Sequence, residues 1–213
     1  MAISMKNKII ERLFLSAIFI VAAIGIILDI HTSAEGRGIF SGLYIFKYFT
    51  LQSNLLVALY PVASILFYKS VRAGWHKKFL APVASYILLT GLTYAILIAP
   101  TSDVHGLEKV ASVLLHYVSP PLFVLYFFLF EKRGLKYREV FSWIIYPLVF
   151  LGWGMYLAII KGDYLYPFFD IEKLGYMVIP YIIAVTICGI LLDLFLVYVN
   201  RRIRKNPAIQ ASE

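Results

Sequence analysis

The chain alternates long apolar runs with short polar segments. Six apolar runs are each long enough to cross the roughly 30 Å hydrocarbon layer of a bilayer as a helix. They cover about residues 13–30, 43–68, 79–98, 110–130, 140–160 and 174–200. Gly, Pro and charged residues mark the loops between them, and no linker is long enough to separate two domains. The pattern predicts an all-α polytopic membrane protein, with a single six-helix transmembrane domain over residues 1–205 and a short polar tail at 206–213.

The basic residues predict how the six spans are oriented. Fifteen Lys and Arg side chains lie on the side of the termini, against five on the opposite side. The larger group is Lys6, Lys8, Arg12, Lys69, Arg72, Lys77, Lys78, Lys132, Arg133, Lys136, Arg138, Arg201, Arg202, Arg204 and Lys205. Basic loops stay in the cytoplasm, so this split predicts that both termini are cytoplasmic. Five or seven spans would break the alternation.

Composition narrows the class of protein. Of the 213 residues, 61% are apolar and only 15% are charged, which is too little polar surface for a soluble domain. The net charge of +8 sits in short loops between apolar runs, a pattern of topology control rather than nucleic-acid binding. The lone cysteine, Cys188, allows neither an intrachain disulfide nor a Cys-based metal site. The first apolar run lacks a small-residue cleavage site, so we interpret it as a span.

Polar side chains inside the predicted spans are costly and need an explanation. His116 is the histidine deep in a span, where it either bonds a neighbouring helix or has a function. The second span begins with unusually polar sequence, in which Lys47, Thr50 and Asn54 share one helix face. Thr50 taken alone would simply bond the carbonyl one turn back. Gln52 is suited to joining two helices.

Depth in the bilayer brings several of these groups into one layer. Counted from the outer ends of the second and fourth spans, Thr50 and His116 each lie roughly 10 Å below the boundary. Trp153 in the fifth span and Tyr181 in the sixth lie at a similar depth. A hydroxyl, an imidazole, an indole and a phenol can therefore share one layer of the bundle.

A threonine hydroxyl beside a histidine is a nucleophile–base pair in outline. The imidazole of His116 would take the proton of Thr50, and the alkoxide would attack an ester carbonyl. Water would then release the acyl group with the same base. The amides of Asn54 and Gln52, or a tyrosine hydroxyl, would stabilise the oxyanion. A pocket at this depth is reached from the outer leaflet, so the expected substrate is a long-chain lipid ester.

Two other functions stay open. Asp-x-His pairs at residues 29–31 and 103–105, with Glu108 nearby, would bind zinc if their loops met, although solvated loop side chains explain them as well. Prolines in and near the spans would kink helices around the cavity of a non-enzymatic lipid-binding or transport protein. We interpret Asp193, the acid well inside a span, as reaching the interface or pairing with Arg201 or Arg202.

Three motifs follow one another over about residues 44–170. The first is Phe46-Lys47-Tyr48-Phe49-Thr50, followed by Ser53-Asn54-Leu55-Leu56. The second is His116 with Pro120 and Pro121. The third is Trp153, Tyr156 and Gly162, which lead into Tyr166-Pro167-Phe168-Phe169-Asp170. In order and spacing they resemble the androgen-induced-gene and androgen-dependent membrane hydrolases and the related bacterial six-span proteins.

The resemblance implies a membrane threonine hydrolase that cleaves fatty acid esters of hydroxy fatty acids. It implies that Thr50 is the nucleophile and that His116 is the base. The family often has an acidic residue ten positions after the histidine, where this chain has Tyr126. The bacterial branch implies a multi-pass protein of the inner (plasma) membrane.

The predicted pocket around this pair draws on several segments. Its expected oxyanion or wall residues are Gln52, Asn54, Trp153, Tyr156 and Tyr181, and its expected rim residues are Lys47 and Tyr166. The loop at 161–173 is a candidate lid. The expected partners are a lipid ester and the bilayer, with no nucleic acid, metal or cofactor. The sequence leaves the oligomeric state open.

Overall fold

The computed structural model describes residues 5–36, 38–66 and 74–205, and every regular element within them is a helix or helical turn. Six helical segments are long and apolar enough to cross a membrane: Lys8–Ala34, Phe49–Leu66, Lys78–Thr101, Gly106–Phe130, Tyr137–Lys161 and Ile171–Arg204. The all-α fold with six spans is therefore confirmed. The predicted polar tail at 206–213 lies outside the described residues.

The chain up to the end of the fourth span forms six α-helices, of which α2 lies between the first two spans. These are α1 (Met5–Ala34), α2 (Ile39–Leu43), α3 (Phe49–Leu66), α4 (Gly74–Thr93), α5 (Gly106–Val113) and α6 (Ser119–Phe130). Short 3₁₀ turns cover Tyr44–Lys47 and Ala99–Thr101, and π-helical turns cover Tyr94–Ile98 and Leu114–Val118. The second π turn joins α5 to α6 within one span.

The last two spans are built in the same segmented way. Their helices are α7 (Val140–Trp143), α8 (Ile145–Tyr156), α9 (Ile171–Leu174) and α10 (Val178–Lys205). A π turn extends α8 over Leu157–Lys161, and 3₁₀ turns cover Tyr137–Glu139, Pro167–Phe169 and Gly175–Met177.

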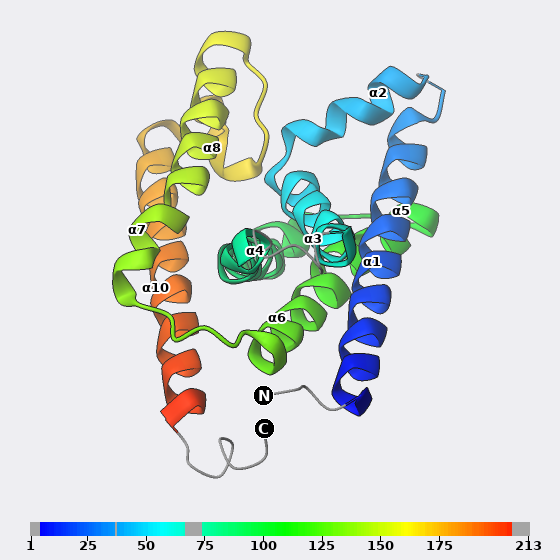
Figure 1. Cartoon of the computed structure of the whole chain (residues 1–213). Coiled ribbons are helices and arrows are strands. Elements are labelled where there is room, and N and C mark those ends of the chain that lie inside the picture. The colour runs from blue at the N-terminus through cyan, green and yellow to red at the C-terminus, as the bar shows by residue number, and fades with distance from the viewer. Residues whose placement is uncertain (1–4, 37, 67–73, 206–213) are drawn as a thin grey trace.

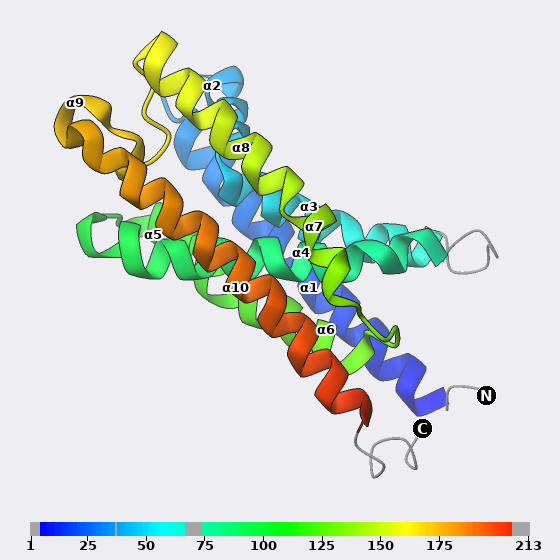
Figure 2. The same cartoon turned by 90° about the vertical axis from the view of Figure 1, so that its left-hand side faces the viewer.

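α4 is the central helix of the bundle. α1 lies on one side of the molecule and α8 and α10 on the other, with α3, α4 and α6 between them (Figure 1). α4 is seen nearly end-on in Figure 1, and Figure 2 shows it running across the direction of α1, α8 and α10. It packs against α3, α6 and α10, and 61% of its span is buried compared with 22% for the α10 span.

The second span begins at Phe49 rather than near Leu43. The preceding residues form α2 and a 3₁₀ turn, and Tyr48 then adopts an extended backbone with φ −84° and ψ 141°, which interrupts the helix. Thr50 consequently lies in the first turn of α3. The predicted start of this helix near Leu43, from which the depth of Thr50 was counted, was wrong.

Buried apolar side chains form two clusters. One joins α1, α3, α4 and α6 around Ile87, Phe123 and Phe127. The other lies where α8 and α10 meet the segment before α9, and its members include Phe150 and Phe169. Phe49 at the start of α3 belongs to this second cluster, so the first turn of α3 stands at the boundary between the two clusters.

Candidate active site

Thr50 and His116 meet although 66 residues separate them in the chain. The Oγ1 atom of Thr50 lies 3.3 Å from the Nε2 atom of His116. Thr50 is buried, and His116 lies in the middle of the π turn Leu114–Val118. A π turn redirects side chains relative to an α-helix, and such turns are frequent at functional sites. The structure thus brings together the two residues that the sequence singled out.

Groups on the far side of the imidazole fix its orientation. The Nδ1 atom of His116 lies 2.9 Å from the carbonyl oxygen of Ser112. The ring of Tyr94 stacks on the imidazole with 3.6 Å between centroids and 14° between planes, and the Ser112 hydroxyl donates to the Tyr94 hydroxyl at 2.6 Å. A carbonyl oxygen only accepts hydrogen bonds, so Nδ1 carries the proton. The lone pair of Nε2 therefore faces Thr50.

Tyr126 does not reach this ring. It follows His116 by ten residues, which corresponds to about 15 Å of helix rise. Its side chain is buried, and its hydroxyl donates to the carboxylate of Glu11 at 3.4 Å. The carbonyl of Ser112, rather than a side chain at position 126, orients the imidazole.

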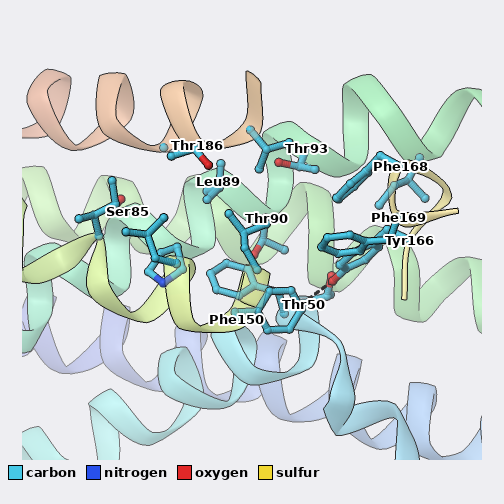
Figure 3. Close-up of a pocket in the computed structure, with 18 of the residues that line it drawn as sticks. Thr50, Ser85, Leu89, Thr90, Thr93, Phe150, Tyr166, Phe168, Phe169 and Thr186 are labelled. Carbon is cyan, nitrogen blue, oxygen red and sulfur yellow. Dashed lines mark hydrogen bonds between the residues drawn. The ribbon is translucent and has the colours of Figure 1, made fainter. Parts of the chain in front are cut away.

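Side-chain hydrogen bonds hold the first turn of α3. Amides in the first turn of a helix have no partner within that helix. The amide of Thr50 donates to the hydroxyl of Tyr166 at 3.4 Å (Figure 3). The Nδ2 atom of Asn54 donates to the carbonyls of Thr50, at 3.0 Å, and Leu115, at 3.2 Å. Because Leu115 directly precedes His116, Asn54 fixes α3 against the π turn.

Gly91 lets α4 approach the same π turn closely. A Cβ atom at this position would lie 2.9 Å from the carbonyl oxygen of His116 and 3.0 Å from Cγ of Pro120. Pro120 has no N–H, so it cannot donate to the carbonyl four residues earlier, which is that of His116. The position beside this carbonyl has no room for a side chain.

A narrow cavity of about 60 Å³ lies beside Thr50, within a wider and partly open space. Most of its wall is apolar, and α4, α8, α10 and the segment before α9 all contribute to it; Figure 3 shows Leu89, Phe150 and Phe169 among the lining residues. Thr50 and Tyr166 line one end (Figure 3). His116 is not among the lining residues, so Thr50 is the member of the pair that borders the cavity.

An ion pair ties the loop before α9 to the start of α3. The Nζ atom of Lys47 lies 2.6 Å from the carboxylate of Asp163, which also accepts from the Tyr44 hydroxyl at 3.0 Å. Burial acts to lower the pKa of Lys47, but the hydrogen bond to Asp163 and nearby charges raise it on balance. The same hydrogen bond lowers the pKa of Asp163. Burial raises the pKa of Tyr166 to about 12, so its hydroxyl keeps its proton at neutral pH.

The two amide side chains predicted to face the oxyanion do not line the cavity. The Nε2 atom of Gln52 donates to the carbonyl of Phe46 at 2.9 Å, and its Oε1 atom accepts from the Tyr146 hydroxyl at 2.5 Å. The amide of Asn54 is engaged with two carbonyls. Both amides are directed at backbone carbonyls rather than at the cavity, and Tyr166 is the hydroxyl that borders the cavity beside Thr50.

Three predicted aromatic wall residues also lie elsewhere. Trp153, Tyr156 and Tyr181 are 46%, 47% and 36% exposed and do not line the cavity. Trp153 stacks on Tyr156 with 5.7 Å between ring centroids. Depth along a helix does not determine the direction of a side chain around the helix axis. These three residues, expected as walls of the pocket, are therefore not part of the cavity beside Thr50.

Asp193 corrects a further prediction. Its side chain is buried, and its carboxyl accepts a hydrogen bond from the Ser85 hydroxyl, so it neither reaches the interface nor pairs with Arg201 or Arg202. Both Asp193 and Ser85 line the cavity. This polar pair was missed because Ser85 lies in the third span and shows no pattern that relates it to the sixth.

The sequence also gave no indication of the groups that orient His116. Ser112 precedes His116 by four residues, so it lies on the same helix face, and this spacing is the signal that could have revealed it. Tyr94 comes from another span and lies within a π turn, which leaves no mark in the apolar pattern.

The alternative zinc site does not assemble. Within residues 8–36, 38–66 and 78–204, no three His, Cys, Asp or Glu side chains gather closely enough to share a metal ion. Asp103 and His105 pair with each other at 3.6 Å, and both side chains are exposed. The two Asp-x-His pairs thus do not form one cluster.

Comparison with known proteins adds no assignment. No protein-family model matches the chain, and searches of curated proteins and of solved structures each found no match. Function is therefore inferred from the residues of the site.

Proposed function

We propose that this protein is an intramembrane ester hydrolase with Thr50 as nucleophile and His116 as general base. The observation that carries the proposal is the 3.3 Å approach of Thr50 Oγ1 to His116 Nε2, with Nδ1 held by the Ser112 carbonyl. Nucleophile, base and orienting group form one hydrogen-bonded series, as catalysis by an activated hydroxyl requires. The resemblance to the androgen-induced-gene and androgen-dependent hydrolases supports the same two roles.

In the first half-reaction, Nε2 of His116 takes the hydroxyl proton of Thr50 as Oγ1 attacks the ester carbonyl carbon. The tetrahedral intermediate collapses with cleavage of the bond to the alcohol oxygen. That oxygen receives the proton from Nε2 and leaves as the free alcohol, and Thr50 is left acylated.

In the second half-reaction, water attacks the acyl-threonine, and Nε2 takes one of its protons. The bond between the acyl carbon and Oγ1 breaks, the acid departs, and the proton on Nε2 returns to Oγ1. The Nδ1 proton stays on the ring throughout, because the Ser112 carbonyl accepts its hydrogen bond without taking the proton.

Two features suit the oxyanion of both intermediates. The hydroxyl of Tyr166 lies beside Thr50 and borders the cavity, so it can donate a hydrogen bond there. Thr50 also lies in the first turn of α3, where the helix dipole gives the helix end a partial positive charge. Both features stabilise negative charge at the carbonyl oxygen.

The cavity supports a substrate with an apolar chain. Most of its lining is apolar, which suits an acyl chain. A long-chain lipid ester, such as a fatty acid ester of a hydroxy fatty acid, would place its acyl chain along α4 and α10 and its ester group beside Thr50. A non-enzymatic lipid-binding protein would use the same cavity but would not need a base directed at Thr50.

We also propose that both termini are cytoplasmic and that the protein lies in a bacterial plasma membrane. The fifteen-to-five division of basic residues supports this orientation. Reporter fusions at Lys8 and at Lys205 should both give cytoplasmic signals. An external signal at either position would contradict the orientation without affecting the hydrolase proposal.

The test is hydrolysis of long-chain esters by the purified full-length protein, combined with labelling by a long-chain fluorophosphonate. Thr50→Ala and His116→Gln should each lower hydrolysis by about 10³-fold or more. Thr50→Ser, which keeps a hydroxyl, should retain part of the activity and all of the labelling stoichiometry. The fluorophosphonate should label the wild type at Thr50 and leave Thr50→Ala unlabelled.

Thr93→Val is the matched control, because Thr93 also lines the cavity but does not contact His116. It should be labelled like the wild type. Equal hydrolysis by the wild type, Thr50→Ala and His116→Gln would refute the two roles. Tight lipid binding without hydrolysis or labelling would favour the non-enzymatic alternative.

A further inference from the structure

The end of the cavity away from Tyr166 holds a carboxyl group. Ser85 on α4 and Asp193 on α10 both line the cavity, and each side chain is 3% exposed. The Ser85 hydroxyl donates to Oδ1 of Asp193. In Figure 3 Ser85 lies at one end of the row of lining residues, and Tyr166 and Phe169 lie at the other. The cavity thus has polar groups at both ends, and between them a mostly apolar wall that includes Thr90, Thr93 and Thr186.

Helical spacing explains how the two ends are joined. Ser85, Leu89 and Thr93 follow one another at intervals of four residues on α4, so they form a single stripe. Gly189 and Asp193 are spaced in the same way on α10. Ser85 precedes Thr90 by five residues, or about 7.5 Å of helix rise. The hydroxyl of Thr90 in turn lies 2.8 Å from that of Ser53 in the first turns of α3.

The carboxyl group of Asp193 has spare capacity to accept hydrogen bonds. Within the described part of the chain, Ser85 is its hydrogen-bond donor, and no Lys, Arg or His side chain lines the cavity. A carboxylate can accept about four hydrogen bonds. Burying it with one neutral donor is costly, since polar groups in apolar surroundings need partners. A donor on a bound molecule would supply the missing partner.

We propose that Asp193 and Ser85 form a subsite for a hydrogen-bond-donating group, a hydroxyl or an amine, on the apolar chain of the molecule that occupies the cavity. The carboxyl accepts from this group, and the apolar walls of Leu89, Phe150 and Val185 contain the chain. A carboxylate on the same chain is disfavoured, because it would place two acidic groups together. This proposal concerns binding alone, so it holds whether or not Thr50 acts as a nucleophile.

A competition experiment tests the subsite in the full-length protein purified in detergent. A radiolabelled long-chain alcohol is displaced by an alkane, an amine and a carboxylate of equal chain length. In the wild type, alcohol and amine should bind about tenfold more tightly than the alkane, and the carboxylate most weakly. Asp193→Asn, which keeps the shape of the side chain, should lose about tenfold in amine affinity and bind the alkane as before.

Two other variants separate ligand binding from a merely structural contact between α4 and α10. Ser85→Ala leaves Asp193 without its internal donor, so amine affinity should be kept or increased. Thr186→Val is the control, because Thr186 lines the cavity while its hydroxyl donates to the Ile182 carbonyl at 2.8 Å. It should leave every affinity ratio unchanged. An unaltered amine-to-alkane ratio in Asp193→Asn would overturn the proposal.

Photolabelling of the wild type covers the case in which Asp193→Asn does not fold. A long-chain amine with a photoreactive group beside its nitrogen should label peptides containing Ser85 or Asp193. Labels confined to the Tyr166 end of the cavity, or to the exposed outer surface, would also overturn the proposal. Neither readout depends on hydrolysis, so a failure here is distinct from a failure of the Thr50–His116 proposal.

Discussion

α3 and α4 differ from α8 and α10 in burial, although all four helices border the same cavity. The α3 and α4 spans are 50% and 61% buried, while those containing α8 and α10 are 28% and 22% buried. Polar side chains of the first pair bond across helices: Ser53 to Thr90, and Asn54 to the carbonyl of Leu115. On α10, Thr186 instead bonds a carbonyl of its own helix.

The difference shows that burial by protein, rather than depth in the bilayer, locates the polar site. A polar group facing lipid can be satisfied only within its own helix, whereas one facing other helices can form a network. Trp153 and Tyr181 lie on the less buried pair of helices and do not line the cavity. Asp193 is an exception on α10, because it faces Ser85 on α4. The effect of a substitution should therefore depend on which pair of helices carries it.

Gly91→Ala should have the largest effect of the structural substitutions. Its Cβ would press on the carbonyl of His116 and on Pro120, both of which belong to a rigid segment. We expect a loss of stability of about 1–3 kcal/mol from overpacking, together with loss of fluorophosphonate labelling at Thr50. Thermal unfolding in detergent and labelling stoichiometry measure the two effects.

Gly152→Ala is the matched control on α8. No atom lies within 4 Å of a Cβ built at Gly152, so the substitution should leave stability and labelling close to those of the wild type. If both alanine variants behave alike, close packing of α4 against the π turn is not what positions His116.

Asn54→Leu should have the next largest effect. The substitution keeps the approximate size of the side chain but removes the hydrogen bonds to the carbonyls of Thr50 and Leu115. Interhelical hydrogen bonds in membranes contribute about 0.6–1.7 kcal/mol, so we expect a loss of stability of roughly 1 kcal/mol. Hydrolysis should fall while ester binding is unchanged, because Asn54 does not line the cavity. A raised KM with unchanged kcat would contradict this positioning role.

The sequence predicted the spans and the central pair but not the supporting groups. Six apolar runs determine six helices, because the hydrocarbon layer fixes their length. The start of the second span was misplaced because residues 43–46 are apolar or aromatic and continue the hydrophobic pattern, although Tyr48 interrupts the helix. The motifs indicated Thr50 and His116. The contact between Tyr94 and His116 depends on two π turns, and an apolar pattern does not reveal a π turn.

The ion pair between Lys47 and Asp163 should have a smaller effect. Its side chains are 13% and 27% exposed, so water still reaches the pair, and ion pairs that water reaches contribute about 0.2–1 kcal/mol. The pKa of Asp163 is lowered from 3.8, so its contribution is present above that pH and is lost as pH falls through the lower folded value. The pKa of Lys47 is raised from 10.5, so its contribution is lost only as pH rises above that value.

Asp163→Asn should therefore be less stable than the wild type by a constant amount from about pH 5 to pH 9, with the difference shrinking in stronger acid. Thermal unfolding across this range measures the difference. Tyr44→Phe is the control, because it removes only the neutral hydroxyl that donates to Asp163. Its difference in stability from the wild type should not shrink in acid. A difference that changes steadily between pH 5 and pH 9 would assign the effect to another titrating group.

The smallest effects should come from the aromatic residues of α8 and α10. Trp153→Phe, Tyr156→Phe and Tyr181→Phe change side chains that are 46%, 47% and 36% exposed and that do not border the cavity. Each should alter stability by less than about 0.5 kcal/mol and leave labelling at Thr50 unchanged.

Tyr166→Phe is the informative contrast, because it removes a hydroxyl that accepts from the Thr50 amide and should slow hydrolysis by about 10²-fold. If Tyr181→Phe slowed hydrolysis as much as Tyr166→Phe, a lipid-exposed phenol would contribute to catalysis, and burial would no longer separate the two pairs of helices.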